Sequence, residues 1–336
     1  MATIRQELTA RVAFPGTQPD VMHVGTITAP RRAEKRTVRV PEPGPTEILI
    51  RVEGCGICGS NLPVWEGRPW FTYPLEPGMP GHESWGVVER VGPEVTRFAP
   101  GDPVALLMNR GFAQYELAPE SMALLLPEAL AAKPFPGEPL ACAMNAARRS
   151  GIREGETVAI VGVGFLGAML TKLASLAGGR VAAISRRKFA REIAGRFGAE
   201  ALFEWAADAP KRLIEWSGAA GFDCVIECVG TQEALDLATQ LTKERGRLVV
   251  AGYHQDGKRQ VDMQLWNWRG LDVINAHERD PQVYLSGMQA AVDAIVNGHI
   301  DPSPLYTHRF SLDELGNAFE MLRTRPEGFM KALVMP

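Results

Sequence analysis

No long run of apolar residues and no long run of like charges occurs in the sequence. The longest apolar stretch, VAIVGVGFLGAML at 158–170, has 13 residues and is interrupted by three glycines, so it is too short to span a bilayer. The formal net charge is -3, and the densest basic stretch, RRAEKR at 31–36, contains Glu34. We therefore expect neither a membrane segment nor nucleic acid as a partner.

Cysteine is scarce, and no secretion signal is recognisable. The chain has five cysteines, an odd number, and MATIRQELTARVAF at its start lacks the apolar core of a signal peptide. We therefore predict reduced thiols and a cytoplasmic protein rather than a disulfide framework. Because one hydrophobic core rarely serves 336 residues, two domains are expected.

The two parts of the chain differ in pattern. Up to about residue 142, short β-like runs such as TEILIRVEG and SWGVVERVG are separated by proline and glycine. From 143 to 279, buried-strand patterns alternate with helical ones, which predicts an α/β domain with a doubly wound parallel sheet. Mixed elements return in 280–336.

A glycine-rich turn, GVGFLG, lies between a predicted strand and a predicted helix. In this G-x-G-x-x-G pattern, Gly162 permits a tight turn, Gly164 lets a pyrophosphate approach the backbone, and Gly167 lets helix and strand pack closely. The helix would begin at Phe165 and Leu166 and offer free N–H groups to the phosphates. We predict a dinucleotide site here, and the alternative is a purely structural turn.

The residues after the second strand of this domain bear on the choice of cofactor. NAD proteins place Asp or Glu about 20 residues beyond the glycines to hold the ribose 2′-hydroxyl. Here the strand ends in Ser185, Arg186 and Arg187, which offer a hydroxyl and two guanidinium groups to a 2′-phosphate. We predict a preference for NADP(H) over NAD(H), and the alternative is that the arginines begin a solvated helix.

Three further motifs lie outside the predicted cofactor domain. They are GCGICGSN with Cys55 and Cys58, GHE with His82 and Glu83, and EPLACAM with Glu138 and Cys142. With GVVERVG and GVGFLG, their order along almost the whole chain resembles the medium-chain dehydrogenase/reductase superfamily, in its zinc-dependent alcohol and polyol dehydrogenase branch. The resemblance implies a GroES-like, partly open β-barrel catalytic domain, 1–142 with 280–336, beside a Rossmann cofactor domain, 143–279.

The resemblance also implies the residues of a zinc site. Cys58 and His82 are expected ligands, and Glu83 is the family's nearby carboxylate, either a ligand or an outer partner. Polyol-type members use the Glu of E-P-L, which points to Glu138, whereas alcohol-type members use a cysteine in this region, here Cys142; we prefer Glu138. Thiolate, imidazole and carboxylate all suit a catalytic zinc, which keeps one position open and lowers the pKa of a bound alcohol.

The sequence departs from this family in three places. ALLMNR follows GDPV directly, so the four-cysteine loop of a second, structural zinc is missing, and one zinc per chain is expected. Ser60 keeps the first position of the family's proton relay, but Pro63 stands where the relay histidine would be. Asn61 replaces the usual aspartate and either anchors the turn or touches substrate.

The candidate substrate residues are aromatic or polar. Trp65 and Trp70 follow the metal loop, and Asn109 and His277 are expected on loops near a cleft between the domains. The E-P-L motif favours polyols or sugars, whereas the aromatic residues favour bulkier alcohols, so both substrate classes stay open.

We predict a zinc-dependent oxidoreductase that transfers a hydride between NADP(H) and a small-molecule alcohol or carbonyl. A homodimer or homotetramer is expected, because LDVINA is predicted as an edge strand of the cofactor domain, where relatives pair. One alternative is a zinc-free quinone or enone reductase of the same superfamily, against which Cys58, His82 and Glu83 argue. The other is a cofactor-binding protein without turnover, which the missing relay histidine allows.

Overall fold

The computed structural model describes residues 20–336, and three β-sheets run through this part of the chain. The strands are β1 (Val21–Ala29), β2 (Arg32–Arg39), β3 (Glu47–Gly56), β4 (Ser84–Val91), β5 (Pro103–Leu106), β6 (Tyr115–Pro119), β7 (Ala123–Leu125), β8 (Thr157–Val161), β9 (Arg180–Ser185), β10 (Ala201–Glu204), β11 (Phe222–Glu227), β12 (Thr242–Val250), β13 (Asp272–Asn275), β14 (Tyr306–Ser311) and β15 (Lys331–Met335). The helices are α1 (Leu62–Glu66), α2 (Gly137–Ser150), α3 (Phe165–Leu176), α4 (Lys188–Arg196), α5 (Ala209–Trp216), α6 (Gln232–Leu241), α7 (Met263–Arg269), α8 (Pro281–Val296) and α9 (Leu315–Thr324).

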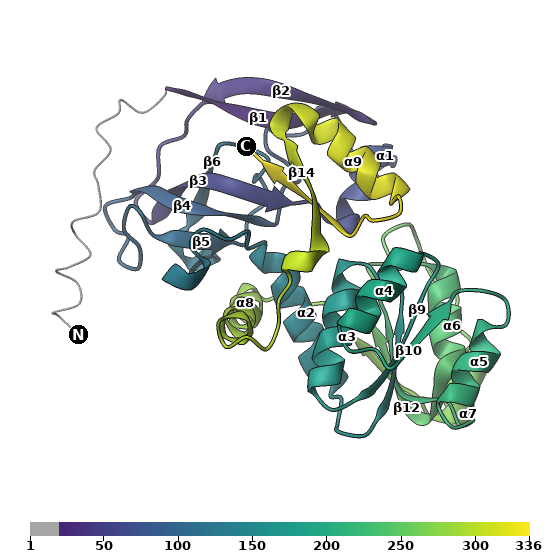
Figure 1. The fold of residues 1–336 in the computed structure, drawn as a ribbon. Helices are drawn as coiled ribbons and strands as arrows, with labels where there is room; N and C mark the ends of the chain where they lie inside the picture. The colour runs from purple at the N-terminus through teal and green to yellow at the C-terminus, as the bar shows by residue number, and fades with distance from the viewer. Residues whose placement is uncertain (1–19) are drawn as a thin grey trace.

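Strands β8 to β13 form a six-stranded parallel sheet in the order β10-β9-β8-β11-β12-β13. Alternate residues of β8 face opposite sides of this sheet: Val158 packs in one core with α3 and α4, and Ala159 packs in another with α5 and α6. Helices therefore cover both faces (Figure 1). The predicted doubly wound sheet is confirmed, and β13 is an edge strand as expected. After β10 the chain crosses to the other side of β8 to form β11, and such sheets bind ligands at the point where the strand order reverses, next to β8.

The second large sheet joins segments from the two ends of the chain. Its order is β14-β15-β3-β4-β5-β7, and β6 also pairs with β3. β15 lies antiparallel to β3, with Val334 opposite Cys55, and β3 lies antiparallel to β4, with Cys55 opposite Ser84. Consequently the end of β3, the start of β4 and the C-terminal strand meet at one place.

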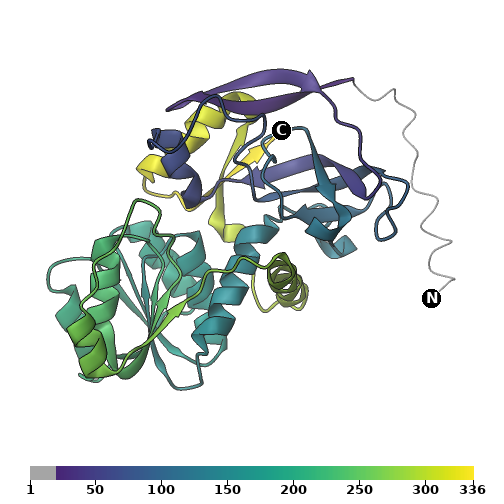
Figure 2. The ribbon, with the colours of Figure 1, turned by 180° about the vertical axis from the view of Figure 1, so that it is seen from behind.

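Helix α2 lies between the two large sheets, and α8 packs beside it below the second sheet, as both ribbon views show (Figure 2). Leu140 of α2 and Met288 of α8 are fully buried in the same hydrophobic core as Val158 of β8. Close contact between these helices depends on small residues, because a Cβ at Gly137 would come within 2.6 Å of the Met288 sulfur. This packing fixes the start of α2 next to the second sheet.

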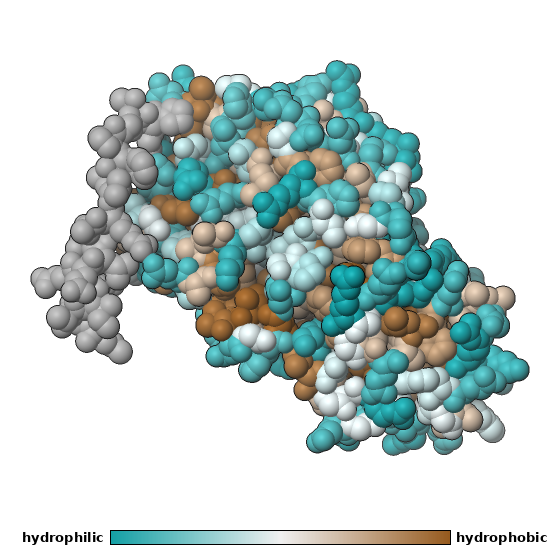
Figure 3. Space-filling view, viewed as in Figure 1, coloured by the Kyte–Doolittle hydropathy of each residue, from teal (hydrophilic) through white to brown (hydrophobic). Residues whose placement is uncertain are grey.

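Apolar residues also gather on the outer surface over α8 (Figure 3). Leu125 and Val296 are about half exposed there and line a shallow groove with Pro127 and Val292. None of the predicted site residues lies in this groove. Across residues 20–336, no helix combines the length and the apolar character that crossing a bilayer requires.

Candidate active site

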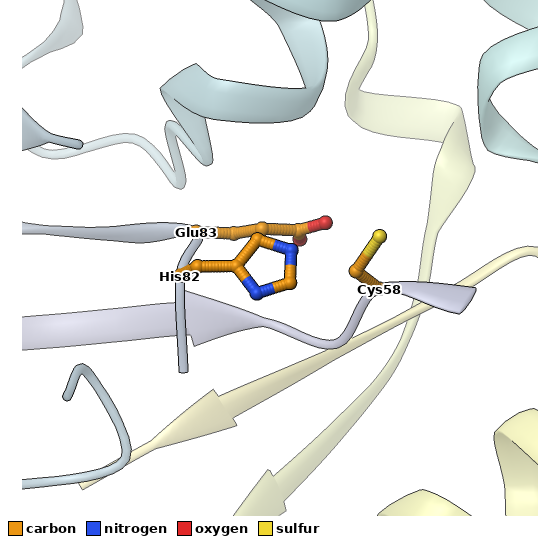
Figure 4. Close-up of side chains that lie close together, drawn as sticks. All are labelled: Cys58, His82 and Glu83. Carbon is orange, nitrogen blue, oxygen red and sulfur yellow. The ribbon is translucent and has the colours of Figure 1, made fainter. Parts of the chain in front are cut away.

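Cys58, His82 and Glu83 converge beside the paired strands β3 and β4 (Figure 4). Cys58 follows the end of β3, and His82 and Glu83 directly precede β4, so the strand pairing brings the two segments together. One ligand atom from each of the three side chains lies within 4.8 Å of the other two. Among residues 20–336, this is the only group of three or more His, Cys, Asp or Glu side chains placed to hold a metal ion.

The loop that carries Cys58 is held by Asn61. The Asn61 side chain is 2% exposed; its Oδ1 accepts the backbone N–H of Cys58 at 3.2 Å, and its Nδ2 donates to the Pro80 carbonyl at 3.3 Å. Both ends of the amide are therefore used to tie the Cys58 loop to the segment before His82. Of the two roles left open by the sequence, the structure shows the anchoring one. Pro63 is buried in the first turn of α1.

His82 is oriented with one ring nitrogen toward the cluster. Nδ1 lies 3.0 Å from the Pro80 carbonyl, which only accepts, so Nδ1 carries a proton; in the neutral imidazole, the form that binds a metal, the lone pair is then on Nε2. Nε2 lies 3.5 Å from the Ser60 hydroxyl. Burial acts to lower the pKa of His82, but the hydrogen bond to Cys58 and the charges of Cys58, Glu138 and Glu83 raise it to about 10. The site therefore concentrates negative charge, which favours a cation.

Glu83 is fully buried and is held by Lys331 of β15. The Lys331 ammonium lies 2.6 Å from Oε1 and 2.5 Å from Oε2 of Glu83, and it donates to the Ile57 carbonyl at 3.4 Å. Burial acts to lower the pKa of Lys331, but the charges of Glu83, Cys58 and Glu138 raise it. Gly56 makes room for this pair, because a Cβ there would lie 1.9 Å from Glu83 Oε2.

Glu138 lies in the first turn of α2, where the helix dipole favours a carboxylate. It is outside the 4.8 Å cluster, although its charge acts on His82 and Lys331. The Cys142 thiol, one turn later, donates to Glu138 Oε1 at 3.2 Å. Burial raises the pKa of Glu138, and burial together with Glu138 raises that of the Cys142 thiol. One thiolate, one imidazole and two carboxylates thus surround the site, a donor set that fits zinc.

The glycine turn has the shape that a dinucleotide needs. Gly162 has φ 93°, and a Cβ at Gly167 would lie 2.0 Å from the Gly162 carbonyl oxygen, so strand β8 and helix α3 touch there. By contrast, no atom lies within 4 Å of a Cβ built on Gly164, the residue that precedes Phe165 and Leu166 at the start of α3. Open space at the N-terminus of a twelve-residue helix suits a pyrophosphate.

Ser185, Arg186 and Arg187, at the end of β9, lie in different surroundings. Ser185 is nearly buried, and its hydroxyl lies 3.4 Å from the backbone nitrogen of Arg187. The Arg186 guanidinium is exposed, pairs with Glu233 at 2.5 Å and stacks 5.1 Å from the centre of the Trp205 ring. Arg187 points elsewhere: it donates to the Val163 carbonyl at 3.3 Å and to the Phe329 carbonyl.

The four candidate substrate residues lie in different surroundings. Trp65 is 1% exposed, stacks on Phe319 with ring centres 4.9 Å apart and donates to Glu320, so it has no surface to offer a substrate. Trp70 is 57% exposed beside Phe71, and Asn109 is exposed on the loop after β5. His277 follows β13, where its Nε2 lies 3.1 Å from the Gly252 carbonyl.

Family comparisons agree with this geometry. Residues 44–128 match the model of the alcohol dehydrogenase GroES-like domain, and residues 166–293 match that of the zinc-binding dehydrogenases. A solved structure described as a zinc-binding dehydrogenase of Sinorhizobium meliloti, bound to NADP, is 30% identical, superposes with a TM-score of 0.81, and matches 95% of this chain and 100% of that one. The chain belongs to the zinc-dependent medium-chain dehydrogenases. Its fold is therefore a GroES-like domain with a Rossmann-type domain.

Other relatives of this family act on alcohols. Human sorbitol dehydrogenase is 28% identical over 84% of this chain and 88% of its own. The 2-dehydro-3-deoxy-L-galactonate 5-dehydrogenase of Pseudoalteromonas atlantica is 26% identical over 86% and 91%. A thermostable alcohol dehydrogenase of Pyrobaculum aerophilum is 28% identical, with a TM-score of 0.80 over 94% of this chain and 100% of that one. This medium-chain dehydrogenase is an oxidoreductase that acts on alcohols with zinc and a nicotinamide cofactor.

Sequence reasoning missed two residues of the candidate metal site. Lys331 binds Glu83 across 248 positions of the chain, and only the pairing of β15 with β3 brings them together. Lys331 is the first residue of an apolar strand, and nothing in the neighbouring sequence predicts that its side chain contacts Glu83. Gly56 is one of the glycines around Cys55, but the sequence does not show why a glycine is needed there, because that depends on the position of the Glu83 side chain.

Proposed function

We propose that this dehydrogenase uses one zinc ion per chain and NADP(H) to interconvert a polyol or sugar-type alcohol and its carbonyl compound. The observation that carries the proposal is the grouping of Cys58, His82 and Glu83 within 4.8 Å. We further propose that 1–142 with 280–336 is the catalytic domain and 143–279 the cofactor domain. Sorbitol and a deoxy-sugar acid in the names of two relatives support a polyhydroxylated substrate.

In the proposed zinc site, Cys58, His82 and Glu138 are the ligands and Glu83 is an outer partner. Lys331 forms an ion pair with Glu83 from the side of β15 and donates to Oε1 at 2.6 Å, although the buried Oε2 accepts no hydrogen bond; a metal ion on Glu83 would have to compete with that ion pair. Glu138 has no cation within ion-pair distance among the described residues, and its only hydrogen bond there comes from the Cys142 thiol. Glu138 is therefore the carboxylate that a metal ion would recruit at least cost.

In the proposed reaction, Ser60 handles the substrate proton, a task separate from those of the zinc and the cofactor. When bound, zinc would polarise the substrate oxygen and the nicotinamide would exchange the hydride. Ser60, 3.5 Å from His82 Nε2, is placed to accept the proton of the substrate hydroxyl while it releases its own hydroxyl proton to solvent, because no histidine follows it at Pro63. Ser60→Ala should therefore lower kcat by roughly 100-fold, the size of a lost proton-transfer group. Retention of full kcat would remove Ser60 from the mechanism.

The proposed NADP(H) preference rests on the end of β9. The Arg186 guanidinium is exposed and already stacked on Trp205. Its carboxylate partner Glu233 is also exposed, and no carboxylate directly follows the strand to repel a 2′-phosphate. Arg186→Asp combined with Arg187→Ala should lower affinity for NADPH far more than for NADH. Equal losses of the two affinities would exclude the preference.

Elemental analysis of gently purified protein tests the function first. One zinc per chain, lost in Cys58→Ala, is expected, followed by NADP+-dependent oxidation in a panel of polyols, sugar acids and aromatic alcohols. Absence of zinc after supplementation would overturn the mechanism.

We also propose a homodimer or tetramer that pairs through the edge strand β13, on which Val273 is 40% exposed. Sedimentation velocity of Val273→Lys checks whether this strand forms the interface.

A further inference from the structure

A hydrogen-bond network in the loop between β12 and α7 reaches the metal loop. Gln255 in this loop donates its Nε2 to the Gly59 carbonyl at 3.3 Å, across 196 positions of the chain. Gly59 lies between Cys58, a proposed ligand, and Ser60, the proposed proton acceptor. The bond therefore joins the loop after β12 of the parallel sheet to the segment that would hold both metal and substrate proton.

The base of this network is Glu227, the last residue of β11, which is fully buried. Its Oε1 accepts the backbone N–H groups of Val229 at 2.6 Å and Gly230 at 2.8 Å. Its Oε2 lies 3.0 Å from Nε2 of His254. One carboxylate thus ties together the loops that follow β11 and β12.

His254, the neighbour of Gln255, is fixed at both ring nitrogens. Arg259 donates its Nε to Nδ1 at 2.7 Å, and because a guanidinium only donates, Nδ1 carries no proton and Nε2–H donates to Glu227. Arg259 also donates to the Gly230 carbonyl at 2.7 Å and pairs with Asp256. The backbone on both sides of Gln255 is therefore held against the sheet edge.

We propose that Gln255 is a positioning residue for the dehydrogenase reaction. It holds the Cys58–Ser60 loop in place relative to the parallel sheet, and Glu227, His254 and Arg259 hold Gln255. Substrate and nicotinamide would be bound by different parts of the fold, and hydride transfer needs the reacting atoms at close approach, so a small displacement of this loop costs rate. The effect on turnover rests on the proposed function. The link itself, by which we mean the hydrogen bond from Gln255 that joins the loop after β12 to the Cys58–Ser60 loop, does not.

Hydrogen–deuterium exchange of residues 54–66, in protein without metal or cofactor, tests the link alone. Gln255→Met keeps the length of the side chain but removes its donor, and should raise exchange in this segment about fivefold, the effect of one lost hydrogen bond. Gln255→Lys restores a donor and should return exchange toward the original rate. Gln260→Met is the matched control, because Gln260 bonds to Gln232 through its backbone and its side chain is exposed.

A second variant tests whether the rest of the network acts through Gln255. Arg259→Met frees His254 and should also raise exchange in 54–66, and combining it with Gln255→Met should add nothing further, because both changes break one chain of contacts. Unchanged exchange in Gln255→Met, or equal effects of Gln255→Met and Gln260→Met, would overturn the link.

Kinetics of the zinc-loaded enzyme test the consequence for the reaction. Gln255→Met should lower kcat about tenfold, with zinc content and the Kd for NADPH unchanged, because the side-chain hydrogen bond of Gln255 ends on Gly59 and not on a proposed zinc ligand or on the glycine turn. Exchange that rises without any fall in kcat would overturn the positioning role. If the unaltered protein bound no zinc, the proposed function would fail, and the exchange experiment would still decide the link.

Discussion

At the scale of single residues, the proposed metal site depends on positions that carry no reactive group. Gly56 and Asn61 neither bind metal nor transfer protons, yet one leaves space for Glu83 and the other ties down Cys58. The family pattern in the sequence pointed to Cys58, His82 and Glu83, and the structure brings these three side chains together. The sequence could not predict Lys331, whose contact with Glu83 exists only after β15 has paired with β3.

Gly56→Ala should disrupt the centre without touching a proposed ligand. The new Cβ would lie 1.9 Å from Glu83 Oε2 and 3.0 Å from Lys331 Cε, so the buried ion pair must separate or shift. We expect a loss of about 3 kcal/mol of unfolding free energy and weaker zinc binding, measured by urea denaturation and elemental analysis. Gly316→Ala is the control, since its Cβ would be 3.6 Å from the nearest atom. Normal zinc content and stability in Gly56→Ala would contradict the packing argument.

Glu116 should make stability depend on pH. It is almost fully buried without a cation partner; burial raises its pKa to about 7, although hydrogen bonds from the Ser84 hydroxyl and the Arg110 N–H, and the Arg110 charge, oppose the shift. Because the folded pKa lies above the usual 4.5, the stabilisation is complete below pH 4.5 and is lost as pH rises to about 7.

Glu116→Gln should remove that pH dependence. The amide cannot ionise, so at pH 8 the variant should be more stable than the unaltered protein by up to about 3 kcal/mol, and the difference should shrink toward pH 5. Denaturant unfolding at several pH values measures it, with Glu94→Gln at an exposed position as control. A constant difference between the two proteins from pH 5 to 8 would show that Glu116 does not titrate in this range.

At the scale of elements, the order of strands and helices was predictable where the pattern is local. The alternation of apolar strands and amphipathic helices over 157–275 predicts the parallel sheet, because the central strands β8, β9 and β11 are buried on both faces. The pairing of β15 with β3 was not predictable from pattern, because the two strands are separated by more than 270 residues and any apolar strand would fit the same description. Trp65 shows a similar limit: a tryptophan near a metal loop does not reveal whether it faces substrate or core.

Two substitutions in the glycine turn should separate packing from cofactor binding. Gly167→Ala places a Cβ 2.0 Å from the Gly162 carbonyl oxygen, which pushes α3 away from β8, so both Tm and affinity for NADPH should fall. Gly164→Ala meets no atom within 4 Å, so Tm should stay the same while affinity falls at least about tenfold, because the methyl group occupies the space of the pyrophosphate. Calorimetric titration and thermal unfolding measure both quantities. Loss of stability in Gly164→Ala would contradict this division.

At the scale of the whole molecule, the site draws on residues from the entire length of the chain. Cys58 and His82 come from the first third, Glu138 from the helix between the two large sheets, and Lys331 from the last strand. The charges around His82 are mostly negative, and they raise its pKa to about 10. A bound dication would neutralise that excess and hold these segments together, so metal binding and folding are coupled.

Removal of zinc should therefore lower thermal stability more than the loss of one local contact would. With free zinc a thousandfold above its Kd, binding contributes about 4 kcal/mol, on the order of 10 °C in Tm for a domain of this size. Differential scanning calorimetry of chelated protein, with and without NADPH, measures the shift. NADPH should still raise Tm in the chelated protein, because the glycine turn and Arg186 lie on the parallel sheet and not on the metal loop. Cys58→Ser should unfold at the Tm of the chelated protein whether or not zinc is added. If chelation removed zinc without lowering Tm, the metal would not tie these segments together, and the residues of β3, β4, α2 and β15 would hold the site open by packing alone.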